Sequence, residues 1–217
     1  EIEAAHADAL YFLGRIASER GNLVEAANLI EKSLTASPDR PERANNLGTI
    51  YQQLGNYETA VQWFETATSG GTGQAEALLN LATIRHTEGK LAEAETGYRR
   101  AIEAKPDFSA AHSNLSALLR LTDRCDEAAN SAARAVELDA NSAKAHNNLG
   151  IILHEQNHLL EAFQSFKRAT EIEPQYAEAY NNMGSVFRDN EQNGAAIASF
   201  KKAIKLDPGM ADAHNNL

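Results

Sequence analysis

Residues 154–158 read His-Glu-Gln-Asn-His and match the H-E-x-x-H string with which zinc proteases bind their metal. In those enzymes both histidines lie on one face of a continuous helix, and the glutamate lies beside the metal-bound water. Here Asn157 takes the place of a turn glycine in a repeating pattern, so we expect the helix to end between His154 and His158. No third ligand follows at a suitable spacing. We therefore predict no metal, no cofactor and no catalytic residue, and a metalloprotease is the weakest of three functional hypotheses.

The other reactive side chains are isolated from one another. Cys125 is the single cysteine, which excludes an internal disulfide, fits a reducing compartment and predicts a small packing residue. His112, His146 and His214 share one position of the repeat, and we expect them to pack against a neighbouring helix. The sequence contains neither a glycine-rich phosphate loop nor a nucleophile elbow. We therefore expect that this chain is not an enzyme.

Asparagine recurs at one position in six successive copies of the pattern: Asn46, Asn80, Asn114, Asn148, Asn182 and Asn216. Asparagine is a poor residue for a helix interior because its side chain competes for backbone hydrogen bonds, so this regularity needs another reason. Its amide can donate and accept, so a row of asparagines could hold the backbone of an extended peptide. The alternative is that these amides bond within or between neighbouring helices and stiffen the array. The first copy carries Phe12, which predicts that the first repeat lies outside the binding stretch.

The asparagines belong to a repeat of 34 residues that runs without insertion from Ala7 to Leu217. A strict period of this length is typical of the tetratricopeptide repeat, a helix–turn–helix unit that buries its apolar face only by stacking on its neighbours. It predicts an all-α, right-handed superhelical solenoid of antiparallel helix pairs, in a single domain spanning residues 1–217, with the first helix of each pair lining the concave surface. The predicted repeats are 7–40, 41–74, 75–108, 109–142, 143–176 and 177–210, with a partial seventh at 211–217.

Each repeat is expected to bring its two helices together at a small residue and to turn at a fixed place. The small residues are Gly14, Gly48, Ala82, Ser116, Gly150 and Gly184. The turn glycines, where a helix end favours a positive φ, are Gly21, Gly55 and Gly89. The residues that replace glycine at the other turns, and that predict turns of a different shape, are Asp123, Asn157 and Glu191. Residues 69–73 read Ser-Gly-Gly-Thr-Gly, which is either drift in an exposed loop or a hinge.

Two further sets of residues could contribute to binding. A polar to mildly basic row follows the asparagines along the first helices and could add charge preferences; it comprises Gln52, His86, Arg120, His154 and Arg188. Trp63 occupies a position that is mostly small or polar in other repeats, which predicts an outward-facing side chain. With Leu29 one repeat away it is a candidate anchor for self-association into a homo-oligomer. The alternative is that Trp63 folds over the surface of its own repeat.

Composition narrows the classes of partner. The net charge is −10 with no block of lysine or arginine, which argues against nucleic acid because phosphates require clustered cations. No apolar run is long enough for membrane insertion, and the N-terminus lacks the regions of a signal peptide, so we expect a cytoplasmic location. The chain begins without methionine and ends inside a partial repeat with no polar capping helix, which predicts that the natural protein continues beyond Leu217.

Residues 98–107, 108–115 and 177–184 carry a narrower resemblance. They resemble the tetratricopeptide region of O-linked N-acetylglucosamine transferases and their bacterial relatives. In that family a ladder of asparagines holds substrate polypeptides by their backbone, so the resemblance implies the same role for the six asparagines here. It implies a substrate-recruiting arm of a larger glycosyltransferase, whose catalytic domain is absent from this chain. The alternative is a free-standing, non-enzymatic adaptor for complex assembly. Under both interpretations the partner is a protein or peptide.

Overall fold

The computed structural model describes residues 2–68 and 73–217, with side chains from His6 onward, and it is all α-helical within these ranges. The first six helices are α1 (Ile2–Glu19), α2 (Leu23–Ala36), α3 (Pro41–Gln53), α4 (Tyr57–Ala67), α5 (Gln74–Thr87) and α6 (Leu91–Ala104). The others are α7 (Ser109–Leu121), α8 (Cys125–Leu138), α9 (Ala143–Glu155), α10 (Leu159–Ile172), α11 (Ala177–Asp189), α12 (Asn193–Leu206) and α13 (Ala211–Asn216). The predicted all-α class is confirmed.

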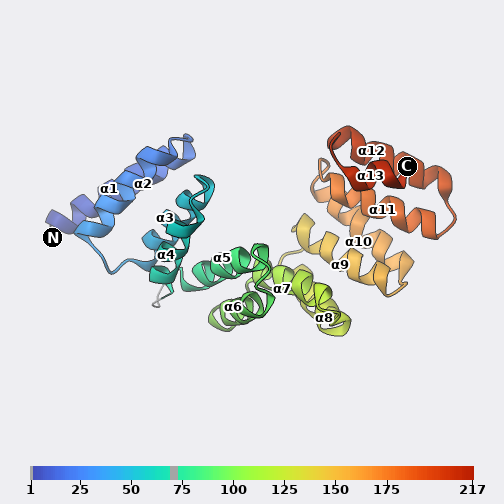
Figure 1. The fold of residues 1–217 in the computed structure, drawn as a ribbon, viewed down its shortest axis with the longest axis horizontal. Coiled ribbons are helices and arrows are strands. Elements are labelled where there is room, and N and C mark those ends of the chain that lie inside the picture. The colour runs from blue at the N-terminus through green and yellow to red at the C-terminus, as the bar shows by residue number, and fades with distance from the viewer. Residues whose placement is uncertain (1, 69–72) are drawn as a thin grey trace. The chain divides into compact units, whose positions relative to one another are not determined.

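Consecutive helices pack as antiparallel hairpins (Figure 1). The first helix of each pair is called an A helix below and the second a B helix. The contacts divide the chain into two compact units, residues 1–106 with α1–α6 and residues 107–217 with α7–α13. Within the first unit α3 also contacts α5, and within the second α9 contacts both α7 and α11, so neighbouring A helices touch one another. This A-helix contact brings residues one repeat apart within reach.

Glycine in the A helices allows the close approach that the repeat pattern predicts. A β-carbon on Gly48 would lie 2.7 Å from the ring of Phe64, and one on Gly184 would lie 2.5 Å from the ring of Phe200. Both aromatic rings are almost completely buried. Because no real side chain tolerates such distances, the ring of the B helix occupies the space that the glycine leaves, and the prediction of a close contact is confirmed.

The turns between the A and B helices have one conformation whether or not they contain glycine. Asp123, Asn157 and Glu191 have φ angles of 58°, 63° and 58°, in the same left-handed region as Gly55 at 77°. The predicted difference in shape is therefore wrong. The reason lies in the hydrogen bonds that end each A helix, which are the same in both kinds of turn. The amide of Asn157 bonds to the carbonyl of His154 at 2.9 Å, as that of Gly55 bonds to Gln52 at 3.0 Å.

The segment 69–73, interpreted from the sequence as either sequence drift in an exposed loop or a hinge, lies outside the described residues except for Gly73, which directly precedes α5.

One charged side chain is buried inside the first unit. Arg43 is 3% exposed, at a repeat position that is alanine in every other copy, as at Ala77. Its Nη1 donates to Ser33 Oγ at 2.6 Å and its Nη2 donates to Asp8 Oδ1. The guanidinium carbon lies 5.1 Å from the ring centroid of Tyr11. Among the described residues, Arg43 Nε has no hydrogen-bond partner. A polar cluster thus replaces alanine packing at the first junction between repeats.

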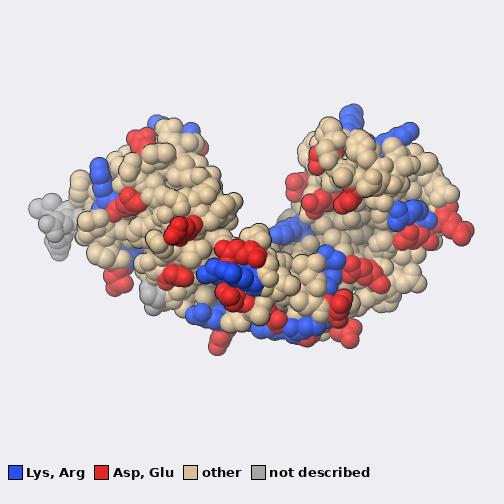
Figure 2. Space-filling model, in the orientation of Figure 1, with Lys and Arg blue, Asp and Glu red and all other residues tan. Residues whose placement is uncertain are grey.

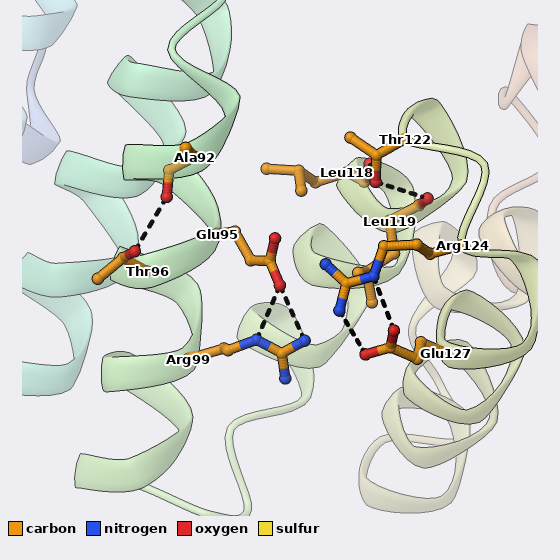
Figure 3. Close-up of polar contacts among 9 residues, drawn as sticks. All are labelled: Ala92, Glu95, Thr96, Arg99, Leu118, Leu119, Thr122, Arg124 and Glu127. Atoms are coloured by element: carbon orange, nitrogen blue, oxygen red, sulfur yellow. Dashed lines mark hydrogen bonds and ion pairs between the residues drawn. The ribbon is translucent and has the colours of Figure 1, made fainter.

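The surface charges pair mostly with near neighbours in sequence. Figure 3 shows Arg99 with Glu95 on α6, 2.9 Å apart, and Arg124 with Glu127 at the start of α8, 2.6 Å apart. On the face drawn in Figure 2, basic and acidic side chains of the described residues are interspersed. Within residues 2–68 and 73–217, no helix is long and apolar enough to cross a membrane.

Candidate functional site

The six asparagines of the sequence pattern lie on A helices, one on each of α3, α5, α7, α9, α11 and α13. All six are half-buried. We call them the ladder asparagines: Asn46, Asn80, Asn114, Asn148, Asn182 and Asn216. Their placement on the first helix of each pair agrees with the predicted arrangement.

In the first unit each ladder amide donates to the preceding A helix. Asn46 Nδ2 lies 2.5 Å from the hydroxyl oxygen of Tyr11. Asn80 Nδ2 lies 3.1 Å from Asn45 Oδ1. In both bonds the acceptor stands 35 residues earlier in the chain. The side chains therefore connect neighbouring repeats rather than competing for the backbone of their own helix.

The second unit repeats this arrangement. Asn148 Nδ2 donates to both the carbonyl and the hydroxyl oxygen of Ser113, at 3.1 and 3.0 Å. Two further bonds of the same kind join Asn182 to Asn147 at 3.1 Å and Asn216 to Asn181 at 3.0 Å. Asn114 differs, because its Oδ1 accepts from Lys144 Nζ at 2.8 Å. Partial desolvation by the surrounding protein lowers the pKa of Lys144, although the charge of Glu178 acts in the opposite direction.

The acceptors one position before the ladder were missed in the sequence analysis. They are Tyr11, Asn45, Ser113, Asn147 and Asn181. A signal for them exists in the Asn-Asn dipeptides at 45–46, 147–148 and 181–182. Bonding between neighbouring helices, the alternative left open by the sequence, is thus present in both units. An asparagine side chain has two N–H groups and a carbonyl oxygen, and one such bond occupies only one of the two N–H groups. The amide can therefore still bond to a ligand.

The flanking row is engaged in contacts of its own. Arg120 Nη1 lies 2.9 Å from Glu155 Oε1, and His154 Nε2 lies 2.8 Å from Asp189 Oδ2. Each of these pairs also spans 35 residues, from the end of one A helix to the end of the next.

The remaining members of the row contact their own repeat or the ladder. Arg188 Nη1 donates to Asn216 Oδ1 at 3.0 Å, and His86 Nδ1 lies 3.3 Å from the Tyr98 hydroxyl. Gln52 is half-buried on α3. Two of the five members of the row, Arg120 and His154, therefore join the ends of neighbouring A helices.

The structure separates the two histidines of the H-E-x-x-H string, as predicted. Helix α9 ends at Glu155 and α10 begins at Leu159, with Asn157 in a left-handed turn between them. His154 is on α9, whereas His158 precedes the first residue of α10. In the part of the chain that the structure describes, no group of three or more His, Cys, Asp or Glu side chains could hold a metal ion.

The predicted packing role of Cys125 is wrong. Cys125, the first residue of α8, is exposed, whereas the longer Leu91 and Leu159 at the same repeat position are half-buried. His146 Nε2 lies 3.2 Å from the carbonyl oxygen of Ala140, and His214 Nε2 lies 2.9 Å from that of Pro208. These imidazoles reach back to the preceding linker, since six residues separate each ring from its partner at the start of a helix. His112, at the same repeat position, is half-buried.

The predicted outward orientation of Trp63 is also wrong. Trp63 is half-buried and packs with Leu29 against the core of the first repeats. The same repeat position is buried at Ser165 and Ser199. At Gly97 an added β-carbon would lie 2.7 Å from that of Ala82. The position faces the A helix of its own pair, so the alternative, in which Trp63 folds over its own surface, is favoured.

Comparisons with known families agree with this architecture. Models described as tetratricopeptide repeat match residues 2–41, 42–107 and 177–210, and a model described as TPR repeat matches residues 152–190. The chain belongs to the tetratricopeptide repeat family. This tetratricopeptide repeat chain is therefore a module for protein–protein interaction. A search of curated proteins gave no match.

Several solved tetratricopeptide structures resemble this chain. PilF of Pseudomonas aeruginosa has a TM-score of 0.84 at 18% identity, with 99% of this chain and 98% of that chain covered. YrrB, described as a TPR protein with an unusual peptide-binding site, has a TM-score of 0.65 at 22% identity, with 87% and 97% covered. The Cut9–Hcn1 assembly of the APC/C has a TM-score of 0.86 at 16% identity, covering 97% of this chain and 42% of that chain. These matches support the fold and give no support to the narrower resemblance to O-linked N-acetylglucosamine transferases.

Proposed function

We propose that this chain is a non-enzymatic adaptor that binds extended polypeptide segments along its A helices through the ladder asparagines. The ladder amides are held in place before any ligand arrives, and this carries the proposal. Asn80 and Asn182 each donate one N–H to a side chain of the preceding A helix. The other N–H and the carbonyl oxygen suit the C=O and N–H of a peptide backbone. Because the amides are fixed beforehand, less conformational entropy is lost when a ligand binds.

The fold-level likeness to YrrB supports the proposal, because the description of that protein names a peptide-binding site. The likeness to Cut9–Hcn1 supports a role in assemblies, because that protein was solved as a hetero-tetramer. A role as the recruiting arm of a glycosyltransferase rests on the sequence resemblance alone. It predicts a transferase domain in the full-length protein, and intact mass with peptide sequencing of the endogenous protein would detect that domain.

One pair of variants separates peptide binding from a purely stiffening role. Asn80→Ala and Asn45→Ala each remove the same 3.1 Å bond between α3 and α5. Only Asn80→Ala also removes a ladder amide. We expect similar losses of melting temperature in the two variants, but weaker peptide binding only in Asn80→Ala. The loss should be about fivefold, because one neutral hydrogen bond contributes about 1 kcal/mol.

The probe is a set of short random-sequence peptides selected by display on the 217-residue chain and then measured by fluorescence anisotropy. Asn130→Ala, at an exposed site on the B helix α8, serves as a control and should change neither property. Equal loss of affinity in Asn80→Ala and Asn45→Ala would favour the stiffening role. Failure to select any peptide would reject the proposal.

A further inference from the structure

A small hollow opens beside the ladder asparagine Asn46, between α1 and α3 in the first unit. Its volume is about 260 Å³. It is lined by Arg15, Ser18, Glu19, Ile30, Asn46, Thr49, Ile50 and Gln53. Ile30 and Ile50 are 1% and 4% exposed and form the floor, whereas Arg15, Glu19 and Gln53 are exposed and form the rim.

The hollow exists because two side chains of the first repeat are smaller than their counterparts. Ile30 stands where four of the other five B helices carry an aromatic residue, as at Phe64 or Phe166, and where α8 carries Ala132. Ser18 stands where other A helices carry a longer polar side chain, as at Gln52. A shorter floor and a shorter wall leave room that an aromatic ring or a long polar chain would fill.

The chemistry of the hollow favours an aliphatic group. Its floor is purely aliphatic, and the charges of its rim oppose each other, since Arg15 Nη2 and Glu19 Oε1 lie 3.9 Å apart. A charged ligand group would lose its hydration in the hollow and would find no unpaired charge of opposite sign there, and such a desolvation is costly. The volume is below the range of about 300–1,000 Å³ that is usual for small-molecule pockets. It therefore suits one side chain of a longer ligand.

We propose that this hollow is the subsite for a single leucine, isoleucine or methionine side chain of a polypeptide whose backbone is held at Asn46. The inference rests on the proposed function. The Asn46 amide is fixed at the wall of the hollow by its 2.5 Å bond to the Tyr11 hydroxyl. Successive side chains of an extended peptide point to opposite sides, so one side chain enters while its immediate neighbours face away. The first repeat then takes part in binding, in contrast to the prediction drawn from Phe12.

The subsite can be filled without disturbing the ladder. Ile30→Phe installs the phenylalanine that the second, fifth and sixth repeats carry at Phe64, Phe166 and Phe200. Gly14 lies opposite Ile30, with its added β-carbon 2.6 Å from Ile30 Cγ1, as Gly48 lies opposite Phe64. The ring should therefore be accommodated as it is in the second repeat. Ser18→Gln fills the wall from a half-buried site on α1 and provides a second variant if Ile30→Phe does not fold. Val24→Phe, which enlarges an exposed side chain on α2, is the matched control.

The measurement compares peptides selected on the full chain and resynthesised with leucine, methionine, glycine, lysine or glutamate at each position in turn. With the parent chain, replacing leucine by glycine at one position should weaken binding about tenfold, and lysine or glutamate should be no better than glycine. Ile30→Phe and Ser18→Gln should reduce this discrimination to about twofold or less, and Val24→Phe should retain it.

If the folded variants Ile30→Phe and Ser18→Gln still distinguish leucine from glycine at this peptide position, the subsite is overturned. A preference of the parent chain for a charged residue at this peptide position would overturn it as well. If Asn80→Ala still weakens binding in that case, the proposed function stands and only the subsite fails. A parent chain that selects no peptide defeats both.

Discussion

The buried cluster around Arg43 allows a stringent test of how the first two repeats are held together. Arg43 lies at a position that is alanine elsewhere, and so does its acceptor Ser33, whose counterparts include Ala67 and Ala101. We consider Ser33→Ala, Arg43→Ala and the double variant, which restores at both places the residue that the other repeats carry.

The magnitudes follow from which group each change leaves unpaired. Ser33→Ala removes an acceptor from a guanidinium that is 3% exposed, which should cost about 1–3 kcal/mol of unfolding free energy. Arg43→Ala breaks a buried ion pair and leaves the Ser33 hydroxyl unsatisfied, so about 2–4 kcal/mol is expected, toward the lower end of the range for such pairs. The loss is moderated because the side chain of Asp8 is 50% exposed and regains water. In the double variant neither group is left without a partner.

We therefore expect the double variant to be more stable than the sum of the single losses predicts, by about 1 kcal/mol or more. Urea unfolding followed by circular dichroism gives the free energies by linear extrapolation. Arg134→Ala, which removes an exposed pair with Glu137, is the control and should change stability by less than about 0.5 kcal/mol. Strictly additive losses would refute the reasoning, since they would mean that Ser33 and Arg43 do not depend on each other.

Three further outcomes are expected. Gly48→Ala should destabilise the chain by about 1–3 kcal/mol, because its β-carbon would lie 2.7 Å from the Phe64 ring. The control Gly194→Ala on α12 meets no atom within 4 Å and should not destabilise the chain. Equal melting temperatures of the two variants would contradict this prediction. Glu191→Gly should raise stability by about 1 kcal/mol in urea unfolding, because its φ of 58° strains a side chain, and an unchanged midpoint would show no strain. A hydrogen bond to Glu31, then burial, raises the pKa of Tyr51 to about 12 from 10.0, so its contribution to stability is complete below pH 10 and is lost as pH rises toward 12. Tyr51→Phe should make that alkaline loss shallower than in the parent, and parallel curves would count against the bond.

Much of the fold could be predicted because the repeat encodes it locally. The recurring small residue and the large residue opposite predict the close helix pair, and the contacts at Gly48 and Gly184 confirm it. The turn residues illustrate where such reasoning fails. Glu191 is a poor residue for a left-handed conformation, yet the hydrogen bonds that end α11 impose it, since Gln192 N bonds to Phe187 O at 2.8 Å. A cooperative helix end thus overrides the preference of one residue.

The sequence by itself determined the period, the all-α class and the position of every ladder asparagine, because each is visible when successive copies of the repeat are aligned. Only the tertiary structure decided what the ladder amides contact. Their partners, such as Asn45 for Asn80, stand 35 residues away rather than 34, an offset set by how neighbouring A helices pack. The same holds for Trp63, which was predicted to face outward and instead packs on the core. Side-chain direction relative to a neighbouring helix depends on the packing geometry of two elements, and a single-sequence pattern contains no direct record of it.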